Sequence, residues 1–527
     1  MTAARQNRFI ALGLFFYGLV LFTCGLDHRE IIGFESRFYL FALEMWRHGP
    51  TWFATTYHQP YPDYPATGVY FIYLFSKMLG ELDKFTAIFP SAVAAALTLS
   101  VTYLIGALYD KRWGIAAVCV LLFTNAFVAE ARTVSLDQYT TLVTAACFYL
   151  AYSAKLLHQT RRLIWIFPLL IFGFAMRGPI GLVIPTGVLC IFYMLEKDVK
   201  RFLITGILAI LLLVICGAIL LGIAYQVGGE QFVKDVLQLQ AFGRMNDGKA
   251  LPWSFYWLES FGAYAIAYPL AILVLLGVKN AEPQDKKLLQ NLLGWALIIV
   301  LGLSIPSDKK IRYILPFAPA LALICGYLVT VTREKKYLHH LWNAFNYFCM
   351  IFPFLCVVAL IVVRKKHPEL NLDHTSLVSF FILMEIVLCV LHWQVKHKEL
   401  VALFIASFTF VMGYIFIAEP INLQLNKTRD FVLGVEALRL QQHAQLVFYH
   451  EGTDGLVIKY LVNTPTDVQP VFVNDVDALS KLNEPVFVVS TEENFQQMPK
   501  EMINTAHVVT RGRLGREIFV VFVPVHH

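Results

Sequence analysis

Long apolar runs recur along the first four-fifths of the chain and constrain its fold more than any other feature. A helix needs about 20 mostly apolar residues to cross a bilayer, and thirteen runs come near or above that length. Hydrophobic residues make up 57% of the chain and charged residues only 15%, whereas soluble domains carry about 25% charged residues. We therefore expect a mainly α, polytopic membrane protein with about thirteen transmembrane helices. The predicted spans are 9–26, 86–109, 114–131, 136–156, 163–177, 179–195, 202–225, 259–278, 288–305, 313–332, 343–363, 376–392 and 400–418.

Lysine and arginine are distributed unevenly over the loops between these runs. An odd number of spans puts the two termini on opposite sides of the membrane. The N-terminal segment and the loops on its side carry 18 Lys and Arg, and the short loops on the other side carry 8. Because cytoplasmic loops are enriched in these residues, we expect a cytoplasmic N-terminus and an extracytoplasmic C-terminus. The first run, 9–26, lacks a small-residue cleavage pattern after it, so we expect a retained span.

A long polar and aromatic loop, 27–85, follows the first predicted span on the extracytoplasmic side. Within 38–46, apolar residues recur at i, i+3 and i+4 spacing, and Glu44, Arg47 and His48 lie on the other side of the helix that this spacing predicts. Such a segment is typical of a helix that lies along the membrane surface. We expect this loop to be structured.

The composition changes again at about Asn422. The tail that follows alternates strand-like runs with helical stretches, which is the pattern of a small α/β domain with a largely parallel sheet. We therefore predict a transmembrane domain, 1–421, and a soluble extracytoplasmic α/β domain, 422–527. The strand-like runs are Gln445–His450, Val471–Val473, Pro485–Val489 and Ile518–Val523.

Cysteine, histidine and net charge exclude several classes of function. The nine cysteines lie in or beside the apolar runs without metal-ligand spacing, and no H-x-x-x-H pattern occurs. We therefore predict no metal site and no cofactor. A net charge of +6, dispersed over 527 residues, gives no support for nucleic-acid binding.

Two acids in the first extracytoplasmic loop, Glu35 and Asp63, are candidates for catalysis. Each is next to aromatic residues, and Asp63 also lies between prolines. A carboxylate at this position could act as general base toward an acceptor hydroxyl or amine while a sugar leaves a phosphate. The alternative is that both are solvated surface acids.

Basic residues on the extracytoplasmic side are candidates for binding an anionic head group. Arginine binds phosphate in a bidentate manner, and lysine acts as a point charge. The alternative is that these side chains reach toward anionic lipid phosphates at the bilayer surface. The candidates are Arg132, Arg177, Arg244, Lys309, Lys310 and Arg312.

Asp137 lies near the start of a predicted span. An acid at a membrane boundary is costly unless it is paired, so Asp137 is a functional candidate. The alternative is an acid that is favoured by the dipole at the start of a helix.

Six short motifs occur in order along the chain, at matching places relative to the predicted spans. Together they resemble the GT-C class of membrane glycosyltransferases, and more closely the bacterial branch that includes the aminoarabinose transferase acting on lipid A and the protein O-mannosyltransferases. The motifs are F-E-S-R-F at 34–38, E-M-W-R-H-G-P-T-W at 44–52, P-Y-P-D-Y-P-A at 60–66, R-T-V-S-L-D at 132–137, R-G-P at 177–179 and K-I-R-Y-I-L-P at 310–316.

This resemblance implies a GT-C fold in a bacterial inner membrane, with the tail in the periplasm. It implies transfer of a sugar from a polyprenyl-phosphate donor to a lipid A-like lipid, a protein or a glycan, and it adds Arg37, Tyr61 and Tyr313 to the substrate-binding residues. The chain departs from the family pattern at Phe34, which replaces an acid, and at Tyr64, which replaces a lysine. Arg177 likewise replaces a lysine.

Two other functions fit the residues taken alone. A transporter or lipid flippase could use the outward cations and Asp137 to line a pathway, but secondary transporters usually contain an internal repeat and broken helices near the membrane centre, and the sequence indicates neither. A polymerase or ligase of surface polysaccharide would share the lipid-linked donor and differ in its product.

Overall fold

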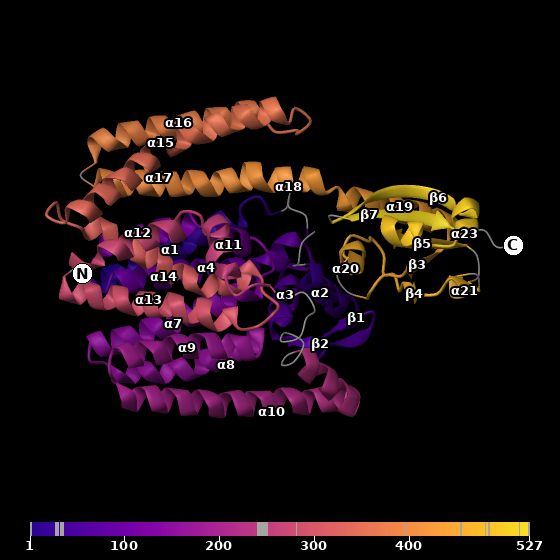
Figure 1. Cartoon of the computed structure of the whole chain (residues 1–527), viewed down its shortest axis with the longest axis horizontal. Coiled ribbons are helices and arrows are strands. Elements are labelled where there is room, and N and C mark those ends of the chain that lie inside the picture. The colour runs from indigo at the N-terminus through magenta and orange to yellow at the C-terminus, as the bar shows by residue number, and fades with distance from the viewer. Residues whose placement is uncertain are drawn as a thin grey trace.

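The structure of the chain is a computed structural model. It describes residues 3–26, 31, 36–239, 251–280, 282–395, 397–453, 456–479, 481–482, 485–515 and 517–524. A bundle of helices occupies one end of the molecule and a sheet occupies the other, with the N-terminus at the bundle end and the C-terminus at the sheet end (Figure 1).

The bundle contains the apolar runs that the sequence predicts as spans. Each predicted run falls on one helix or on two or three consecutive helices. The helices are α1 (Ala3–Thr23), α4 (Lys84–Gly106), α5 (Lys111–Leu122), α6 (Asn125–Ala131), α7 (Leu136–Leu156), α8 (Ile166–Arg177), α9 (Pro179–Leu195), α10 (Val199–Leu237), α11 (Phe255–Ala263), α12 (Ala267–Gly277), α13 (Pro283–Ser304), α14 (Ala318–Gly326), α15 (Lys336–Lys366), α16 (His374–Gln394), α17 (Lys398–Gly413) and α18 (Glu419–Asn426).

Eight helical segments among the described residues are long and apolar enough to cross a membrane, and up to ten if each of two bent pairs counts as one span. The number thirteen therefore stays a prediction. The pair α5–α6 bends by 76° and the pair α11–α12 by 110°. The sequence indicates no broken helix near the membrane centre, but residues 123–124 and 264–266 interrupt runs that are continuous in hydropathy.

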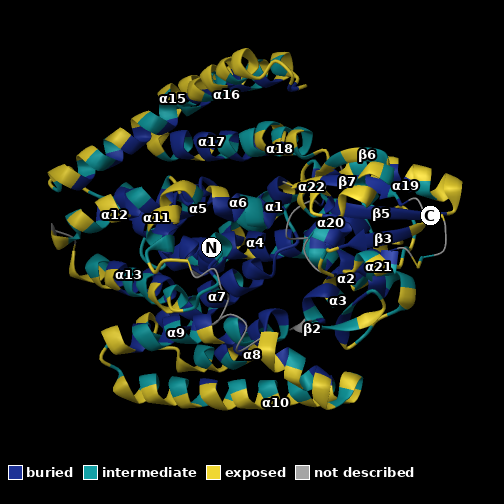
Figure 2. Cartoon of the chain, turned by 45° about the vertical axis from the view of Figure 1, so that its right-hand side comes forward, coloured by how far each residue is buried: buried dark blue, intermediate teal, exposed yellow. Residues whose placement is uncertain are grey.

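Small residues bring the central helices together, and the outer helices turn apolar side chains outward. Gly18 of α1 faces Ala96 and Leu99 of α4, which is the close approach that small residues permit between membrane helices. In the most apolar 18-residue stretch of α10 only 17% of the residues are buried, and in that of α16 only 11%. Figure 2 shows exposed bands along these helices, and such large apolar surfaces are typical of contact with lipid.

The first long loop is structured, as predicted. It contains α2 (Ser36–His48), the hairpin strands β1 (Phe53–Thr56) and β2 (Gln59–Pro65), and α3 (Thr67–Leu79). Phe38, Phe41 and Met45 of α2 are buried, which confirms the predicted amphipathic helix. Its polar side is not fully solvated, however, because Glu44 is also buried.

The tail forms a five-stranded sheet in the order β4-β3-β5-β7-β6. Strand β3 pairs in parallel with β4 and β5, whereas β7 pairs antiparallel with β5 and β6. The sheet is therefore mixed rather than largely parallel, because the chain ends in a hairpin of which β6 was not predicted. The strands are β3 (Gln445–Tyr449), β4 (Val471–Val473), β5 (Val486–Thr491), β6 (His507–Leu514) and β7 (Glu517–Val523); the helices of this part are α19 (Thr428–Gln442), α20 (Leu456–Leu461), α21 (Val476–Leu479), α22 (Glu492–Gln496) and α23 (Lys500–Thr505).

The structured first loop lies between the bundle and the tail sheet (Figure 1). Leu40 of α2 is part of the hydrophobic core on one face of that sheet, together with Val432 and Phe448. Phe53 of the hairpin packs edge-on against Phe232 of α10, with ring centroids 5.0 Å apart. The loop is therefore fixed on both sides, and it can hold residues in a defined place above the bundle.

Candidate functional site

A cavity of about 200 Å³ lies where α2 meets the α6–α7 connection and the C-terminus of α8. Three residues predicted for substrate binding line it together, although they are far apart in the sequence. The lining residues are Phe38, Glu130, Thr133, Val134, Ser135, Leu136, Asp137, Arg177 and Arg312.

Asp137, Arg177 and Arg312 form one buried charge cluster at this cavity. Arg177 Nε donates a hydrogen bond of 3.0 Å to Asp137 Oδ1, and Arg312 Nε lies 3.5 Å from Asp137 Oδ2. The side chains are 8%, 1% and 17% exposed, respectively. Asp137 is in the first turn of α7, where the helix dipole also favours its charge. Two guanidinium groups thus lie against one carboxylate at the wall of the cavity.

The R-G-P motif places Arg177 at a sharp turn between two helices. Arg177 is the last residue of α8, Gly178 has φ 66° and ψ −152°, and Pro179 is the first residue of α9. This backbone conformation is open almost only to glycine, and proline fits the first helical position because its missing N–H needs no partner there. The local sequence therefore directs the Arg177 side chain to the end of the bundle.

The K-x-R-Y motif brings a second group of cations to Arg177. The ring of Tyr313 lies 5.6 Å from the Arg177 guanidinium carbon, 5.4 Å from that of Arg312 and 5.9 Å from Lys310 Nζ. Lys310 Nζ also lies 3.6 Å from an oxygen of Asp308. Lys309 points elsewhere, because its ammonium is buried and donates to the Leu251 carbonyl at 2.9 Å.

Arg132 is in the same connection as Asp137 but belongs to a different cluster. It is fully buried and makes a bidentate pair with Glu419 of α18, with both hydrogen bonds at 2.8 Å. Its Nη1 donates to the carbonyls of Leu21, Phe22 and Cys24 at the end of α1. Arg132 thus joins α1 to α18 through these hydrogen bonds. Its role in substrate binding stays a prediction.

The two predicted catalytic acids cannot be located as side chains. Glu35 lies outside the described residues, as does Arg244, and Asp63 is described by its backbone in β2 alone. Phe38, three residues after Glu35, lines the cavity. The predicted residues Arg37 and Tyr61 contact each other, with the guanidinium carbon 5.4 Å from the ring centroid.

Two acids near the site were not selected from the sequence. Glu130 lines the cavity and accepts a hydrogen bond from the Ser135 hydroxyl. An acid near a membrane boundary was the signal that selected Asp137, and the same signal applies to Glu130. Glu419, the partner of Arg132, is 287 residues away from it in the chain, and no local pattern links them.

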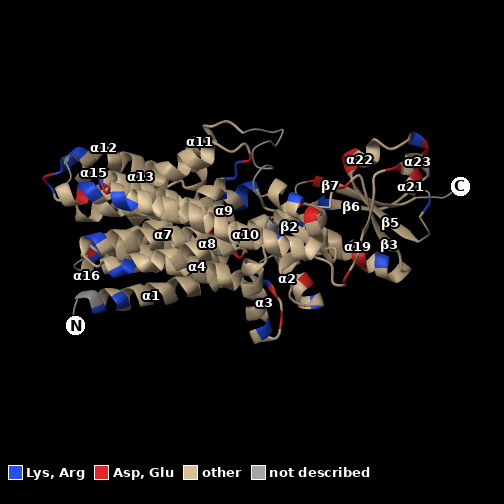
Figure 3. Cartoon of the chain, turned by 90° about the horizontal axis from the view of Figure 1, so that it is seen from below, with Lys and Arg blue, Asp and Glu red and all other residues tan. Residues whose placement is uncertain are grey.

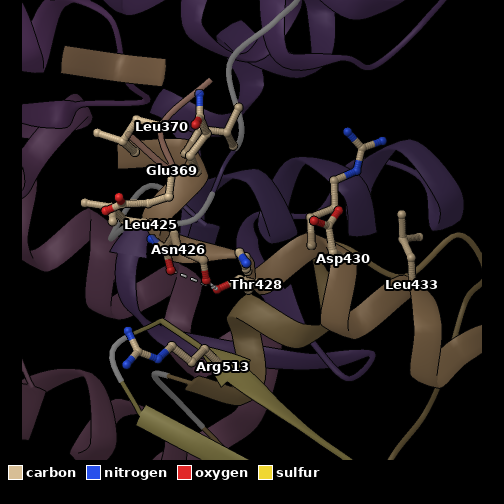
Figure 4. Close-up of a pocket in the computed structure, with 12 residues that line it drawn as sticks. Glu369, Leu370, Leu425, Asn426, Thr428, Asp430, Leu433 and Arg513 are labelled. Carbon is tan, nitrogen blue, oxygen red and sulfur yellow. Dashed lines mark hydrogen bonds between the residues drawn. The ribbon is translucent and has the colours of Figure 1, made fainter. Parts of the chain in front are cut away.

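A larger pocket of about 730 Å³ lies away from this cluster, between the α15–α16 connection, the α18–α19 junction and β6. Figure 4 shows Glu369 and Leu370 on one side of the junction and Arg513 on the other. None of the predicted site residues lines this pocket. The cavity at Asp137 is therefore the candidate site.

Comparisons with known proteins agree with this architecture. Residues 63–224 match the family model described as dolichyl-phosphate-mannose-protein mannosyltransferase. The undecaprenyl phosphate-alpha-4-amino-4-deoxy-L-arabinose arabinosyl transferase of Yersinia enterocolitica is 24% identical over 325 residues, which are 58% of this chain and 56% of that protein. An uncharacterized protein of Aquifex aeolicus is 25% identical over 184 residues, 34% of this chain and 40% of that protein. The chain thus spans about half the length of the curated relatives that it matches.

Solved structures match over nearly the whole chain. The crystal structure of ArnT from Cupriavidus metallidurans bound to undecaprenyl phosphate has a TM-score of 0.72 at 15% identity, and the match covers 98% of this chain and 97% of that one. The apo structure of the same protein has a TM-score of 0.73 at 14% identity, over 99% and 98% of the two chains. At this identity the match establishes the fold. The resemblance that the six motifs predict is thus confirmed as a resemblance, and the chain has the fold of the solved ArnT structures.

Proposed function

We propose that the chain is a membrane glycosyltransferase that moves a sugar from a polyprenyl-phosphate donor to an acceptor on the extracytoplasmic side. One observation carries the proposal: Arg177 and Arg312 lie against Asp137 in the wall of a cavity, and guanidinium groups suit a phosphate ligand. The fold match to a protein crystallised with undecaprenyl phosphate supports the chemical class of that ligand.

The charge of the cluster suits the leaving group of this reaction. An acceptor hydroxyl oxygen attacks C1 of the sugar, and the bond between C1 and the phosphate oxygen breaks with its electron pair going to that oxygen. The phosphate thereby changes from a diester with one negative charge to a monoester with up to two. Arg177, Arg312 and Lys310 stabilise the added charge, and such electrostatic stabilisation is usually the largest catalytic contribution. Attack opposite to the leaving phosphate inverts the configuration at C1.

The acceptor proton goes to a carboxylate of the first loop, either Glu35 or Asp63. Phe38, near the start of α2, lines the cavity. Tyr61 packs on Phe41 of α2 with ring centroids 5.3 Å apart. Arg37 and Tyr61 then position the segments that carry the two acids. No metal or cofactor is needed for this step. The acceptor is a lipid A-like lipid, a protein or a glycan.

The proposed arrangement in the membrane follows the charge distribution. In Figure 3, Lys and Arg gather at the bundle end where the N-terminus lies, and the middle of the helices is nearly free of charged residues. We assign residues 1–421, with about thirteen spans, to a transmembrane domain and residues 422–527 to a soluble domain. The N-terminus is then cytoplasmic, and the tail is periplasmic in a bacterial inner membrane.

The test uses purified protein, a synthetic polyprenyl-phosphate sugar and extracted envelope lipids or proteins as acceptors. Glu35→Gln and Asp63→Asn are assayed singly, and the matched control is Arg161→Gln, an exposed arginine in the connection between α7 and α8. We expect one of the two acid variants to lose transfer by about 100-fold or more and the control to keep it. Full activity in both acid variants would remove the general base from this loop. A labelled donor that crosses the membrane without forming any glycosylated product would support a transporter instead.

A further inference from the structure

Four potential metal ligands from three separate segments meet at the junction of the first loop and the tail. Glu44 and His48 are on α2, His58 is at the tip of the β1–β2 hairpin, and Asp467 is between α20 and β4. One ligand atom each of Glu44, His48 and His58 lies within 4.8 Å of the other two. Asp467 Oδ2 lies 3.1 Å from His48 Nε2 and 3.7 Å from His58 Nε2.

These distances fit the geometry of a transition-metal site. Zinc binds imidazole nitrogen and carboxylate oxygen at roughly 2.0–2.2 Å, so neighbouring ligands of a tetrahedral site are roughly 3.3–3.6 Å apart. The distances from Asp467 to the two imidazoles bracket this range. Small side-chain rotations would bring Glu44 into the same shell. Two carboxylates and two neutral imidazoles also balance the charge of a divalent cation.

The buried carboxylate of Glu44 is a second, independent observation. Glu44 is only 6% exposed. Its hydrogen bonds, from the Thr55 hydroxyl and the His58 backbone N–H, are both long at 3.3 Å. Among the residues that the structure describes, no lysine or arginine lies within ion-pair distance of it. Burying a charged carboxylate is costly without a compensating charge, and a cation at this position would supply it.

The hairpin holds His58 at the cluster against its backbone preference. Tyr57 and His58 form a two-residue turn with φ angles of 53° and 61°, and bulky residues rarely adopt this region. Tail contacts fix the turn, because the Tyr57 hydroxyl donates to the Thr453 carbonyl at 2.6 Å and its ring packs edge-on against Phe472. Such strain persists only where the surroundings enforce it. Here it presents His58 to Asp467.

We propose that Glu44, His48, His58 and Asp467 bind one divalent transition-metal ion of the zinc type, which clamps α2 and the hairpin to the tail. Arg47 Nη1 lies 3.2 Å from Asp467 Oδ1, and this ion pair orients the carboxylate so that Oδ2 faces the imidazoles, as outer-shell partners of metal ligands commonly do. The same helix lines the cavity through Phe38, so the clamp fixes the distance between the tail and the candidate site.

Metal binding is measured on the full chain, which is purified with a tag that carries no histidine, stripped with a chelator and then reloaded with Zn²⁺ or Co²⁺ and freed of excess metal. We expect one equivalent of Zn²⁺ per chain by elemental analysis, a Co²⁺ derivative with the visible absorption of a tetrahedral site, and a higher melting temperature with Zn²⁺. His48→Gln and Asp467→Asn should each weaken Zn²⁺ binding at least tenfold. His58→Asn should do the same, and asparagine tolerates the positive φ of this turn.

The matched control is His443→Asn, which replaces an exposed histidine with φ 50° at the end of α19. It should bind Zn²⁺ as the unchanged protein does. The proposal is overturned if the unchanged protein binds less than half an equivalent of Zn²⁺, or if the His48 and Asp467 variants, folded by gel filtration, bind it unweakened. It is equally overturned if the melting temperature responds to acidification but not to Zn²⁺, because the cluster would then be an ion-pair network of protonated histidines.

Discussion

In the part of the chain that the structure describes, two buried arginine clusters use the guanidinium charge in different ways. In the first, Arg132 is matched by one carboxylate, Glu419, and its remaining donors go to the carbonyls that end α1. In the second, Arg177 and Arg312 share Asp137 and face a cavity. Both clusters are at the same end of the bundle, and the six-motif pattern includes an arginine of each.

The difference shows what a buried cation needs before it can serve chemistry. A guanidinium whose donors are all used by the protein is neutralised and holds helices together. A guanidinium that lines a cavity, in contrast, is within reach of a ligand that enters it. Sequence position alone does not distinguish the two cases, because Arg132 and Asp137 are five residues apart in one short connection.

The largest effect should come from breaking the matched pair. Arg132→Met removes both hydrogen bonds from the guanidinium to the Glu419 carboxylate, and removing one member of a buried ion pair costs about 3–5 kcal/mol. We expect a loss of folded protein, measured as thermal unfolding in detergent, rather than a higher KM for the donor. The double variant Arg132→Met/Glu419→Leu should recover much of that stability. If Arg132→Met unfolds normally but loses transfer, the first cluster is part of the site after all.

Breaking the shared cluster should affect catalysis instead. Arg312→Met leaves Asp137 paired with Arg177 but removes one of the two guanidinium groups that line the cavity. We expect kcat for sugar transfer to fall by about 100- to 1,000-fold, as when one donor to a developing negative charge is removed. The melting temperature should change little, because the Arg312 side chain is partly exposed and at 3.5 Å is the more distant partner of Asp137. Transfer within threefold of the unchanged protein would contradict this assignment.

A smaller effect on both properties should follow from changing the turn that carries Arg177. Gly178→Ala places a Cβ at φ 66°, and such strain costs about 1–3 kcal/mol. The turn should relax and move Arg177 away from Asp137, so both the melting temperature and transfer should fall. Gly434→Ala, in α19 where a Cβ meets open space, is the control: transfer should not change, and the melting temperature should not fall, because alanine in a helix interior is more stable than glycine by about 1 kcal/mol.

Much of this arrangement follows from local sequence. The remaining parts depend on contacts between residues that are distant in the chain. Hydropathy located every long helix, and the R-G-P and K-x-R-Y motifs selected Arg177 and Arg312. The partner of Arg132 could not be predicted, because Glu419 is 287 residues away in the chain and is brought to it only by the tertiary fold. The proposed metal cluster was missed for the same reason: Glu44 and His48 have helical i, i+4 spacing, but His58 and Asp467 join them only after the hairpin and the tail have folded.

The smallest effect should come from a third shared carboxylate, at the other end of α9 and roughly 25 Å from Arg177 along that helix. Glu196 follows α9 and accepts hydrogen bonds from Lys155, Lys287 and Asn291. Burial raises its pKa, but the hydrogen bonds from Lys155 and Lys287 outweigh burial and leave the pKa below its usual value. The folded state therefore gains stability above the usual Glu range, and this gain is lost as the pH falls through the lowered pKa.

Glu196→Gln should therefore lower the melting temperature at pH 7 slightly. The loss in the free energy of unfolding should be no more than about 1 kcal/mol, since both lysines are partly exposed. The difference from the unchanged protein should vanish in acid, and transfer at pH 7 should be unaffected. Two cations around one carboxylate would then be insufficient for catalysis without a position beside α2. If this variant lost transfer while its fold stayed intact, catalysis would also depend on a pair of cations around a carboxylate far from α2, and position beside the first loop would not be what the reaction requires.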